Sequence, residues 1–251
     1  MNSIEQLYRT RTPGSVALGE RAARVMPGGD TRSVTFHRPY PLAIARGAGP
    51  FLWDVDGNRY IDLLGNYTSL VHGDAYPPIV EAIARASANG TAWPARNTAQ
   101  VELALICERV ASVERVRFCN SGSEAGMLAA QLARHVTGRS RLLMARQGYH
   151  GSYDDLSSEW AGEGGRTTLA EYGDAASFEA ILARHGGDIA AVFLEPLLGS
   201  SGIIAPPPDF LPRVAGAAAR AGALFVADEV KRCALEWAAP RQRRESRPTS
   251  R

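Results

Sequence analysis

The sequence is poor in lysine, because Lys231 is the only lysine among 251 residues that include 28 lysine and arginine residues in total. It therefore has no glycine-rich loop followed by lysine to hold a nucleoside triphosphate, and it has no second carboxylate cluster to hold magnesium. Cysteine is also scarce, and Cys107, Cys119 and Cys233 form no Cys-x-x-Cys pair. An odd number of unpaired thiols indicates neither a zinc site nor a disulfide framework, so we expect no metal centre.

Long apolar runs are missing as well. No run approaches the ~20 residues needed to span a bilayer. The first residues, Met-Asn-Ser-Ile-Glu-Gln, lack the basic and then apolar layout of a signal peptide. The composition, 45% hydrophobic and 22% charged, is that of an ordinary globular protein with a sizeable core. We therefore expect a cytoplasmic protein that does not bind membranes.

Charge is distributed unevenly along the chain. Residues 231–251 carry a local charge of +5 in a chain of net charge +2, so the preceding residues are net negative. Few apolar residues follow Ala239, which predicts a solvated and disordered tail. Because no aromatic residues alternate with the arginines of this tail, we do not expect it to bind nucleic acid.

The pattern of the chain predicts three segments. Residues 1–64 form an N-terminal segment with an antiparallel hairpin, since Phe51 to Leu63 reads as two strands around the turn Asp56-Gly57-Asn58. Residues 65–230 form an incomplete large domain in which, from about residue 101 onward, short apolar runs alternate with helical stretches, as is typical of a parallel sheet wound with helices. Residues 231–251 form the basic tail. The expected fold class is α/β, with a mostly parallel sheet covered by helices on both faces and preceded by a small antiparallel unit.

The expected strands and helices can be placed from hydrophobic periodicity. Strands are predicted at Val113 to Cys119, Arg141 to Ala145, Ile189 to Leu194 and Ala223 to Ala227. The last of these is fully apolar, as a central strand buried on both faces should be. Helices are predicted at Pro77 to Ala86, Thr98 to Val110, Glu124 to Thr137 and Pro212 to Arg220.

The first candidate site follows the strand that is expected to end at Cys119. The motif Asn120-Ser-Gly-Ser-Glu-Ala125 places a glycine and two hydroxyl groups at a helix N-terminus. Free backbone N–H groups and the helix dipole at such a point suit a phosphate. Serine and glutamate at this spacing also form an ordinary helix cap. On this motif alone both interpretations stay open.

Two further motifs follow expected strands. Gly148-Tyr149-His150-Gly151 comes after the strand that ends near Ala145, where open α/β sheets bind ligands. Either ring could stack on a planar heterocycle, and a surface turn is the alternative. Asp228-Glu229-Val230 ends the most apolar strand. A carboxylate there can pair with a protonated ring nitrogen, and a metal ion is the less favoured alternative.

In chain order, these motifs together with Glu195-Pro196 resemble the class III aminotransferases, which are fold type I enzymes that use pyridoxal phosphate. The resemblance runs from about Ala22 to Val230 and includes the hairpin from Trp53 to Asp62. It is closest to the branch of glutamate-1-semialdehyde aminomutase and the β-phenylalanine-type aminotransferases. It implies a transaminase or aminomutase that acts on a carboxylate-bearing amino acid, and a homodimer in the full-length family.

The resemblance also implies roles for individual residues. Ser121, Gly122 and Ser123 would hold the cofactor phosphate, Tyr149 would stack on the pyridine ring, Asp228 would pair with the ring nitrogen, Val230 would pack behind the ring, and Glu195 would lie beside it in a polar network. Arg32 would bind the substrate carboxylate as a bidentate fork, and a solvated loop arginine is the alternative.

The chain departs from the resemblance after Val230. In the family, the lysine that carries the cofactor as a Schiff base follows a few tens of residues later, and this sequence has no lysine there. Lys231 is a poor substitute, because at ~3.3 Å per extended residue its Cα would lie ~10 Å beyond Asp228 and head away from the strand end. We therefore expect a truncated or out-of-frame chain with an incomplete large domain, inactive alone. The alternative is a non-catalytic remnant or binding subunit that keeps the cofactor contacts or pairs with an intact paralogue.

Overall fold

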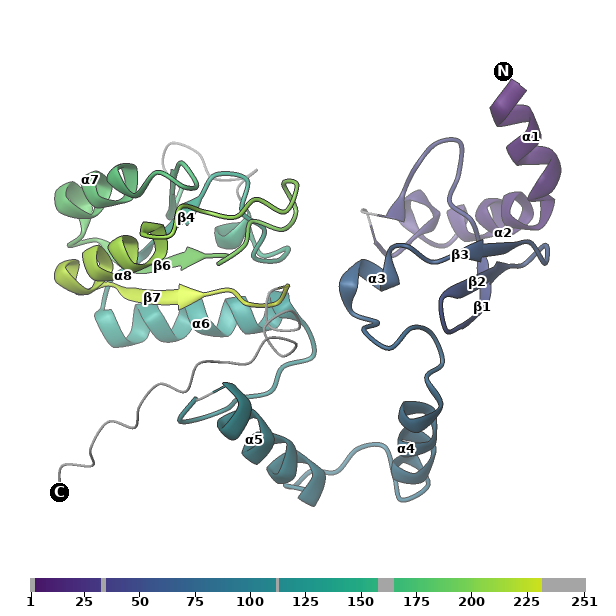
Figure 1. Ribbon diagram of the computed structural model, residues 1–251, viewed down its shortest axis with the longest axis horizontal. Coiled ribbons are helices and arrows are strands. Elements are labelled where there is room, and N and C mark those ends of the chain that lie inside the picture. Colours follow the sequence, from purple (N-terminus) through teal and green to yellow (C-terminus); the bar gives the residue numbers. More distant parts are fainter. Residues whose placement is uncertain (1–2, 33–34, 112, 158–164, 232–251) are drawn as a thin grey trace. The chain divides into compact units, whose positions relative to one another are not determined.

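The computed structural model describes residues 3–32, 35–111, 113–157 and 165–231. The chain divides into two compact units, Met1–Val101 and Glu102–Arg251, and each is described by itself. Figure 1 labels the helices and strands of both units. The division into three segments that the sequence suggests stays a prediction, and residues 232–251 of the expected tail lie outside the described residues.

The first unit contains a small antiparallel sheet. Strands β1 (Ile44–Ala48), β2 (Phe51–Asp54) and β3 (Arg59–Ile61) pair in the order β1-β2-β3, which confirms the predicted hairpin. Asp54 holds the turn, because its buried carboxylate accepts hydrogen bonds from the Asn58 backbone N–H at 2.8 Å and from the Tyr60 hydroxyl at 2.8 Å. Burial and the hydrogen bond to Asp54 raise the pKa of Tyr60 to about 12.

Helices surround this hairpin in the chain. They are α1 (Ser3–Arg11), α2 (Pro13–Ala23), the 3-10 turn η1 (Pro27–Gly29), α3 (Gly65–Thr68) and α4 (Pro77–Ser87). The carboxylate of Asp56, in the hairpin turn, accepts hydrogen bonds from the N–H groups of Gly14 at 2.7 Å and Ser15 at 3.2 Å. The turn therefore caps the N-terminus of α2, where backbone donors lack partners within the helix. Proline at the first position of α2 and α4 is consistent with that geometry.

The second unit is built on a parallel sheet. Strands β4 (Arg141–Ala145), β5 (Thr167–Ala170), β6 (Ile189–Leu194) and β7 (Leu224–Ala227) are arranged in the order β5-β4-β6-β7. Each of the three neighbouring pairs is parallel. Helix α5 (Thr98–Ala111) precedes the sheet in sequence, and the 3-10 turn η3 (Asp154–Leu156) lies between β4 and β5.

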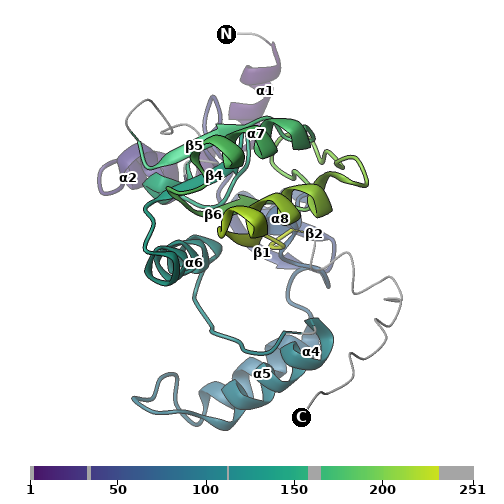
Figure 2. The ribbon, with the colours of Figure 1, turned by 90° about the vertical axis from the view of Figure 1, so that its left-hand side faces the viewer.

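Both faces of this sheet are covered by helices. On one face, Leu142 and Met144 of β4 pack with Ala130 and Ala133 of α6 (Gly122–Thr137). On the other face, Leu143 belongs to a core shared with α7 (Ala175–His185) and α8 (Phe210–Ala221). Figures 1 and 2 show α7 and α8 on one side of the sheet and α6 on the other. Successive side chains of a strand point to opposite faces, so β4 contributes to the core on each side of the sheet. This three-layer arrangement confirms the predicted α/β fold.

One detail of the predicted sheet is wrong. Residues 113–119 form no strand, because their backbone pairs with none of the described strands. Strand β7, whose apolar run is typical of a central strand, pairs only with β6 among the described strands, and Leu224 is 38% exposed. An apolar composition indicates that a strand avoids water, but it does not specify how many neighbouring strands pair with it.

Candidate functional site

The candidate site lies at the carboxyl edge of the parallel sheet. Strands β4, β6 and β7 are parallel neighbours, so the segments that follow them emerge at the same edge. Tyr149 and His150 follow β4, Glu195 follows β6 and Asp228 follows β7. Open α/β sheets bind ligands at this edge. The fold therefore brings together motifs that are far apart in the sequence.

The start of α6 is capped by its own side chains. The Ser121 hydroxyl accepts a hydrogen bond from the N–H of Glu124 at 3.2 Å, and the Glu124 carboxylate accepts one from the N–H of Asn120 at 2.6 Å. This reciprocal cap is one of the two interpretations that the sequence left open. The cap is compatible with the second interpretation, a phosphate site, because the positive end of the helix dipole still lies at this point.

Gly151 lets the loop after β4 touch the first turn of α6. Its φ is +107°, and a Cβ on Gly151 would lie 2.5 Å from the Ser123 hydroxyl oxygen and 2.7 Å from its Cα. The same hydroxyl accepts a hydrogen bond from the N–H of Ser152 at 3.0 Å. Only glycine fits this approach, since a side chain would be strained by the backbone angle and would overlap the helix.

His150 and Asp228 form a partly buried pair. Nδ1 of His150 lies 2.8 Å from Oδ2 of Asp228, and the two side chains are 1% and 17% exposed. The other ring nitrogen, Nε2, is buried and has no hydrogen-bond partner among the described residues. Burial by itself would raise the pKa of Asp228. The hydrogen bond and charge of His150, the N–H of Val230 and the charge of Lys231 outweigh burial and bring that pKa below its ordinary value.

Glu195 is a buried carboxylate that accepts hydrogen bonds from three segments. Its Oε1 accepts the N–H of Tyr149 at 2.9 Å. Its Oε2 accepts the N–H of Gly199 at 3.2 Å and a hydrogen bond from Nζ of Lys231 at 2.8 Å. Glu195 is 3% exposed, so these donors take the place of water around the carboxylate. The carboxylate thus connects the segments that follow β4, β6 and β7.

The side chain of Lys231 folds back toward the end of β6, where Nζ reaches Glu195 and also donates to the Ser200 hydroxyl at 2.9 Å. Nζ also lies 5.5 Å from the centroid of the Tyr149 ring. The flexible lysine stem, and not the direction of the backbone alone, determines where the ammonium lies. The expectation that Lys231 is a poor substitute for the Schiff-base lysine stays a prediction.

The remaining predicted residues differ in their surroundings. Tyr149 is 49% exposed, and Val230 is 70% exposed. A Cβ on Gly122 would lie 3.5 Å from Cγ2 of Val230, so the end of β7 adjoins the start of α6. Arg32 belongs to the first unit, where its Nη1 donates to the Asn66 side-chain oxygen at 2.9 Å. The roles expected for these residues stay predictions.

Sequence reasoning missed the partners of His150 and Lys231. The tetrapeptide around His150 was identified, but nothing in its spacing pointed to Asp228, 78 residues away. Lys231 and Glu195 are likewise 36 residues apart. Both contacts depend on the order of the strands in the sheet.

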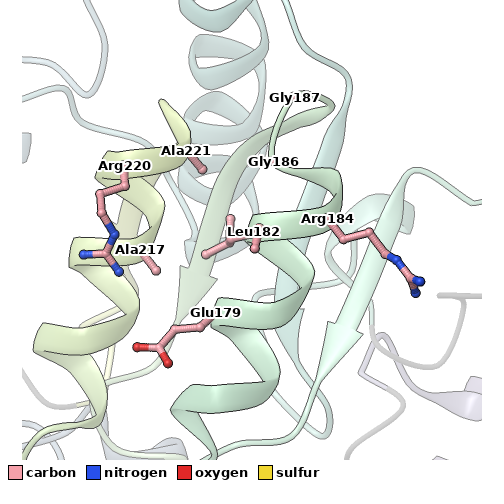
Figure 3. Close-up of a pocket in the computed structure, with 9 residues that line it drawn as sticks. Glu179, Leu182, Arg184, Gly186, Gly187, Ala217, Arg220 and Ala221 are labelled. Carbon is pink, nitrogen blue, oxygen red and sulfur yellow. The ribbon is translucent and has the colours of Figure 1, made fainter.

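One cavity of the second unit lies elsewhere. It is lined by α7, α8 and the loop before β6, including Glu179, Leu182, Gly187, Ala217 and Arg220 (Figure 3). None of the motifs at the carboxyl edge lines it. The candidate site is therefore assigned by its converging polar groups and not by the presence of a deep cavity.

Comparison with known proteins agrees with the arrangement of these motifs. The family described as aminotransferase class-III matches residues 34–233. The chain belongs to the class-III aminotransferases. The match includes the loop at the start of α6, the Tyr149 loop and the Asp228 strand end.

Named relatives come from two branches of this family. The chain is 41% identical over 241 residues to a β-phenylalanine transaminase of Variovorax paradoxus, a match that covers 91% of this chain and 54% of the relative. It is 41% identical over 231 residues to a glutamate-1-semialdehyde 2,1-aminomutase of Dichelobacter nodosus, covering 84% and 54%. The chain spans about half the length of the curated relatives it matches.

Solved structures give the same result for the fold. The β-phenylalanine aminotransferase of Variovorax paradoxus superimposes with a TM-score of 0.83 at 40% identity, covering 90% of this chain and 54% of that one. An omega-transaminase of Sphaerobacter thermophilus superimposes with a TM-score of 0.82 at 36% identity, covering 89% and 57%. The class-III aminotransferases are fold type I enzymes, as the resemblance implied.

The described residues show neither a membrane-spanning helix nor a metal-binding cluster. None of the helices in these residues is long and apolar enough to cross a membrane. The same residues contain no group of three or more His, Cys, Asp or Glu side chains placed to hold a metal ion.

Proposed function

We propose that this chain binds pyridoxal phosphate at the carboxyl edge of its sheet and belongs to an enzyme that transfers the amino group of a carboxylate-bearing amino acid. The observation that carries the proposal is the partly buried Asp228 carboxylate, which His150 holds at 2.8 Å at the end of β7, where Val230 adjoins the N-terminus of α6. A carboxylate and a positive helix end at one edge suit a ligand with a cationic ring and an anionic phosphate.

The residues present fit the cofactor at both of its ends. At the phosphate end, Ser121, Gly122 and Ser123 begin α6, and glycine at the second position leaves space for a close approach. At the ring end, the lowered pKa of Asp228 keeps its carboxylate ionised near neutral pH, as pairing with a protonated ring nitrogen requires.

Further residues complete the proposed cofactor site. The exposed face of Tyr149 offers an aromatic surface for the ring. Val230, beside Gly122, offers an apolar contact behind the cofactor ring. Glu195 lies near the cofactor ring, because it accepts a hydrogen bond from the backbone of Tyr149.

When bound, pyridoxal phosphate supplies an electron sink for the carbon that carries the amino group of the substrate. The part of this chain is to hold a negative charge at Asp228, so that the ring nitrogen keeps its proton. His150 orients that carboxylate through Nδ1. Arg32 binds the substrate carboxylate, a role that suits a guanidinium because it can form two parallel hydrogen bonds. The relatives support both a transaminase and an aminomutase as the parent activity.

We infer that the protein acts as a homodimer. Supporting this, α4 carries the exposed apolar side chains Ile79, Val80 and Ile83, which are 48%, 50% and 62% exposed. Contiguous apolar side chains on a helix face are typical of surfaces that become buried on association. Residence in the cytoplasm stays a prediction.

The experiment that tests the cofactor proposal is a calorimetric titration of the 251-residue chain with pyridoxine phosphate. This ligand has a hydroxymethyl group in place of the aldehyde, so its binding does not depend on any lysine. We expect saturable binding that Asp228→Asn weakens about tenfold or more, since the partner of the ring nitrogen loses its charge. Glu179→Gln, on α7 and outside the proposed cofactor site, is the control and should bind as the unchanged chain does. Absence of saturable binding, or equal binding by Asp228→Asn, would overturn the proposal.

A second candidate function is binding without turnover. The observation that favours it is that the amine of Lys231, the only lysine, is already engaged by Glu195 and Ser200. We therefore expect residues 1–251 alone, mixed with pyridoxal phosphate and β-phenylalanine, to release no keto acid. Detection of keto acid above that of the same mixture without protein would reject this candidate in favour of catalysis.

A further inference from the structure

Lys231 neutralises the most deeply buried carboxylate of the site. Glu195 is 3% exposed, and the ammonium of Lys231 is the cation that it contacts, at 2.8 Å. Its other donors, the N–H groups of Tyr149 and Gly199, carry only partial charges. A carboxylate this far from water is costly to bury unless an opposite charge and hydrogen-bond donors contact it.

Gly199 is shaped to admit the lysine stem. A Cβ on Gly199 would overlap Cδ of Lys231 and lie 2.9 Å from Cε and 3.0 Å from Nζ. The backbone of Gly199 is not in the left-handed region, so alanine would suit its conformation. A Cβ at this position would therefore displace the flexible end of the Lys231 side chain without straining the backbone.

Lys231 acts on Tyr149 in two ways. Its Nζ lies 5.5 Å from the centroid of the Tyr149 ring, within the range of a cation–π contact. Through Glu195 it also supports the hydrogen bond that holds the Tyr149 backbone at 2.9 Å. The ring that is proposed to stack on the cofactor is therefore held at both its backbone and its side chain.

We propose that Lys231 is a positioning residue, which uses its charge to fix Glu195 and the ring of Tyr149 for cofactor binding and does not serve as an amine that reacts with the cofactor. This inference rests on the proposed function, because it concerns the same site. It goes further by giving the only lysine of the chain an electrostatic role at that site.

The first test compares two ligands in Lys231→Met and Lys231→Arg. If Lys231 positions Tyr149, Lys231→Met weakens pyridoxine phosphate and pyridoxal phosphate by a similar factor, about tenfold, which corresponds to ~1.4 kcal/mol. Lys231→Arg keeps the charge and restores most of the binding. If Lys231 instead reacts with the aldehyde, only pyridoxal phosphate loses affinity and Lys231→Arg rescues nothing, which would overturn the proposal.

The second test uses Gly199→Ala, which displaces the lysine stem while leaving Lys231 in the chain. We expect this variant to weaken pyridoxine phosphate about as much as Lys231→Met, and we expect the double variant to be no worse than either single one. Gly187→Ala, whose Cβ would meet nothing within 4 Å, is the matched control and should bind normally. Additive losses, or no loss in Gly199→Ala, would contradict the proposal.

Amine labelling gives a readout that needs no cofactor. Because Lys231 is the only lysine, acetylation of a side-chain amine reports on that residue alone. We expect Gly199→Ala to acetylate several times faster than the unchanged chain, since Nζ loses its contacts with Glu195 and Ser200. Equal rates would count against the proposal.

These measurements distinguish a failure of the proposed cofactor site from a failure of the role proposed for Lys231. If the unchanged chain binds neither ligand, the proposed cofactor site fails. If it binds both and Lys231→Met binds as tightly, the cofactor site stands and the role of Lys231 fails.

Discussion

Nδ1 of His150 lies 2.8 Å from Oδ2 of Asp228, and this contact bridges the ends of two strands that are not neighbours. Strand β6 lies between β4 and β7 in the sheet, and the imidazole meets Phe193 of β6 edge to face, with 5.9 Å between ring centroids. The pair therefore links the segments after β4 and β7 across the end of β6. It also holds the carboxylate that is proposed to contact the cofactor ring.

The pair of His150 and Asp228 makes the free energy of unfolding depend on pH. Because the folded-state pKa of Asp228 is below its ordinary value, folding favours the ionised carboxylate. That contribution is complete above the unfolded-state pKa of about 3.9 and is lost as the pH falls through the lower folded-state value. Urea unfolding between about pH 6 and pH 3 should therefore show a smaller loss of stability in acid for Asp228→Asn than for the unchanged chain.

His150→Phe is the companion variant, since it keeps Asp228 but removes the partner that lowers its pKa. It should also show a smaller loss of stability in acid, at the cost of lower stability near neutral pH. If both variants kept the full acid dependence of the unchanged chain, the pairing would not stabilise the ionised carboxylate.

Substitutions of Ser121 separate its role as a helix cap from a role in phosphate binding. Aspartate and asparagine both cap helices well, so Ser121→Asp and Ser121→Asn should keep the free energy of unfolding within about 0.5 kcal/mol, whereas Ser121→Ala should lose about 1 kcal/mol. For pyridoxine phosphate, Ser121→Asp should bind much more weakly than Ser121→Asn, because its charge repels the phosphate. Equal affinities by calorimetry would mean that Ser121 is only a cap.

Gly151→Ala should damage the approach of the Tyr149 loop to α6. The φ of +107° and the overlap with Ser123 both oppose a Cβ, so we expect a loss of roughly 2 kcal/mol or more in the free energy of unfolding. Gly187→Ala has open space around its Cβ and should change stability by less than about 0.5 kcal/mol. Thermal unfolding followed by circular dichroism compares the two, and equal melting temperatures would contradict the close contact.

Arg139 is expected to stabilise the opposite edge of the sheet. Its Nη1 donates to the backbone carbonyls of Gly186 at 2.9 Å, Ile189 at 3.1 Å and Ala221 at 2.8 Å. These carbonyls belong to the ends of α7 and α8 and the start of β6. Arg139→Ala should therefore lower the free energy of unfolding by about 3 kcal/mol, because several buried acceptors lose a charged donor.

The matched control for Arg139 is Arg184→Ala. Figure 3 shows the Arg184 side chain on α7 pointing away from α8. Its removal should change the urea midpoint only slightly, as is usual for exposed residues. A loss in Arg184→Ala as large as that in Arg139→Ala would show that the effect is one of net charge and not of the carbonyl contacts.

The parts of the fold that the sequence predicted correctly are those with strong local patterns. Strands β4 and β6 are compact apolar runs, and their predicted bounds match those observed. The hairpin was predicted because Asp-Gly at a turn favours tight reversal. Strand β5 and helix α7 were not predicted. The strand, Thr167–Ala170, is short and mixed in polarity and follows a glycine-rich segment of the sequence. The strand expected at 113–119 was wrong because alternation alone does not supply a pairing partner.

The sequence by itself determined the family of this protein and the motifs of its site, because glycine positions, helix caps and apolar strand runs are local properties of the chain. The tertiary structure alone decided how those motifs meet. Parallel strand order brings His150 to Asp228 across 78 residues and Lys231 to Glu195 across 36 residues. These contacts hold because charges removed from water require partners, and only the folded sheet determines which partners are within reach.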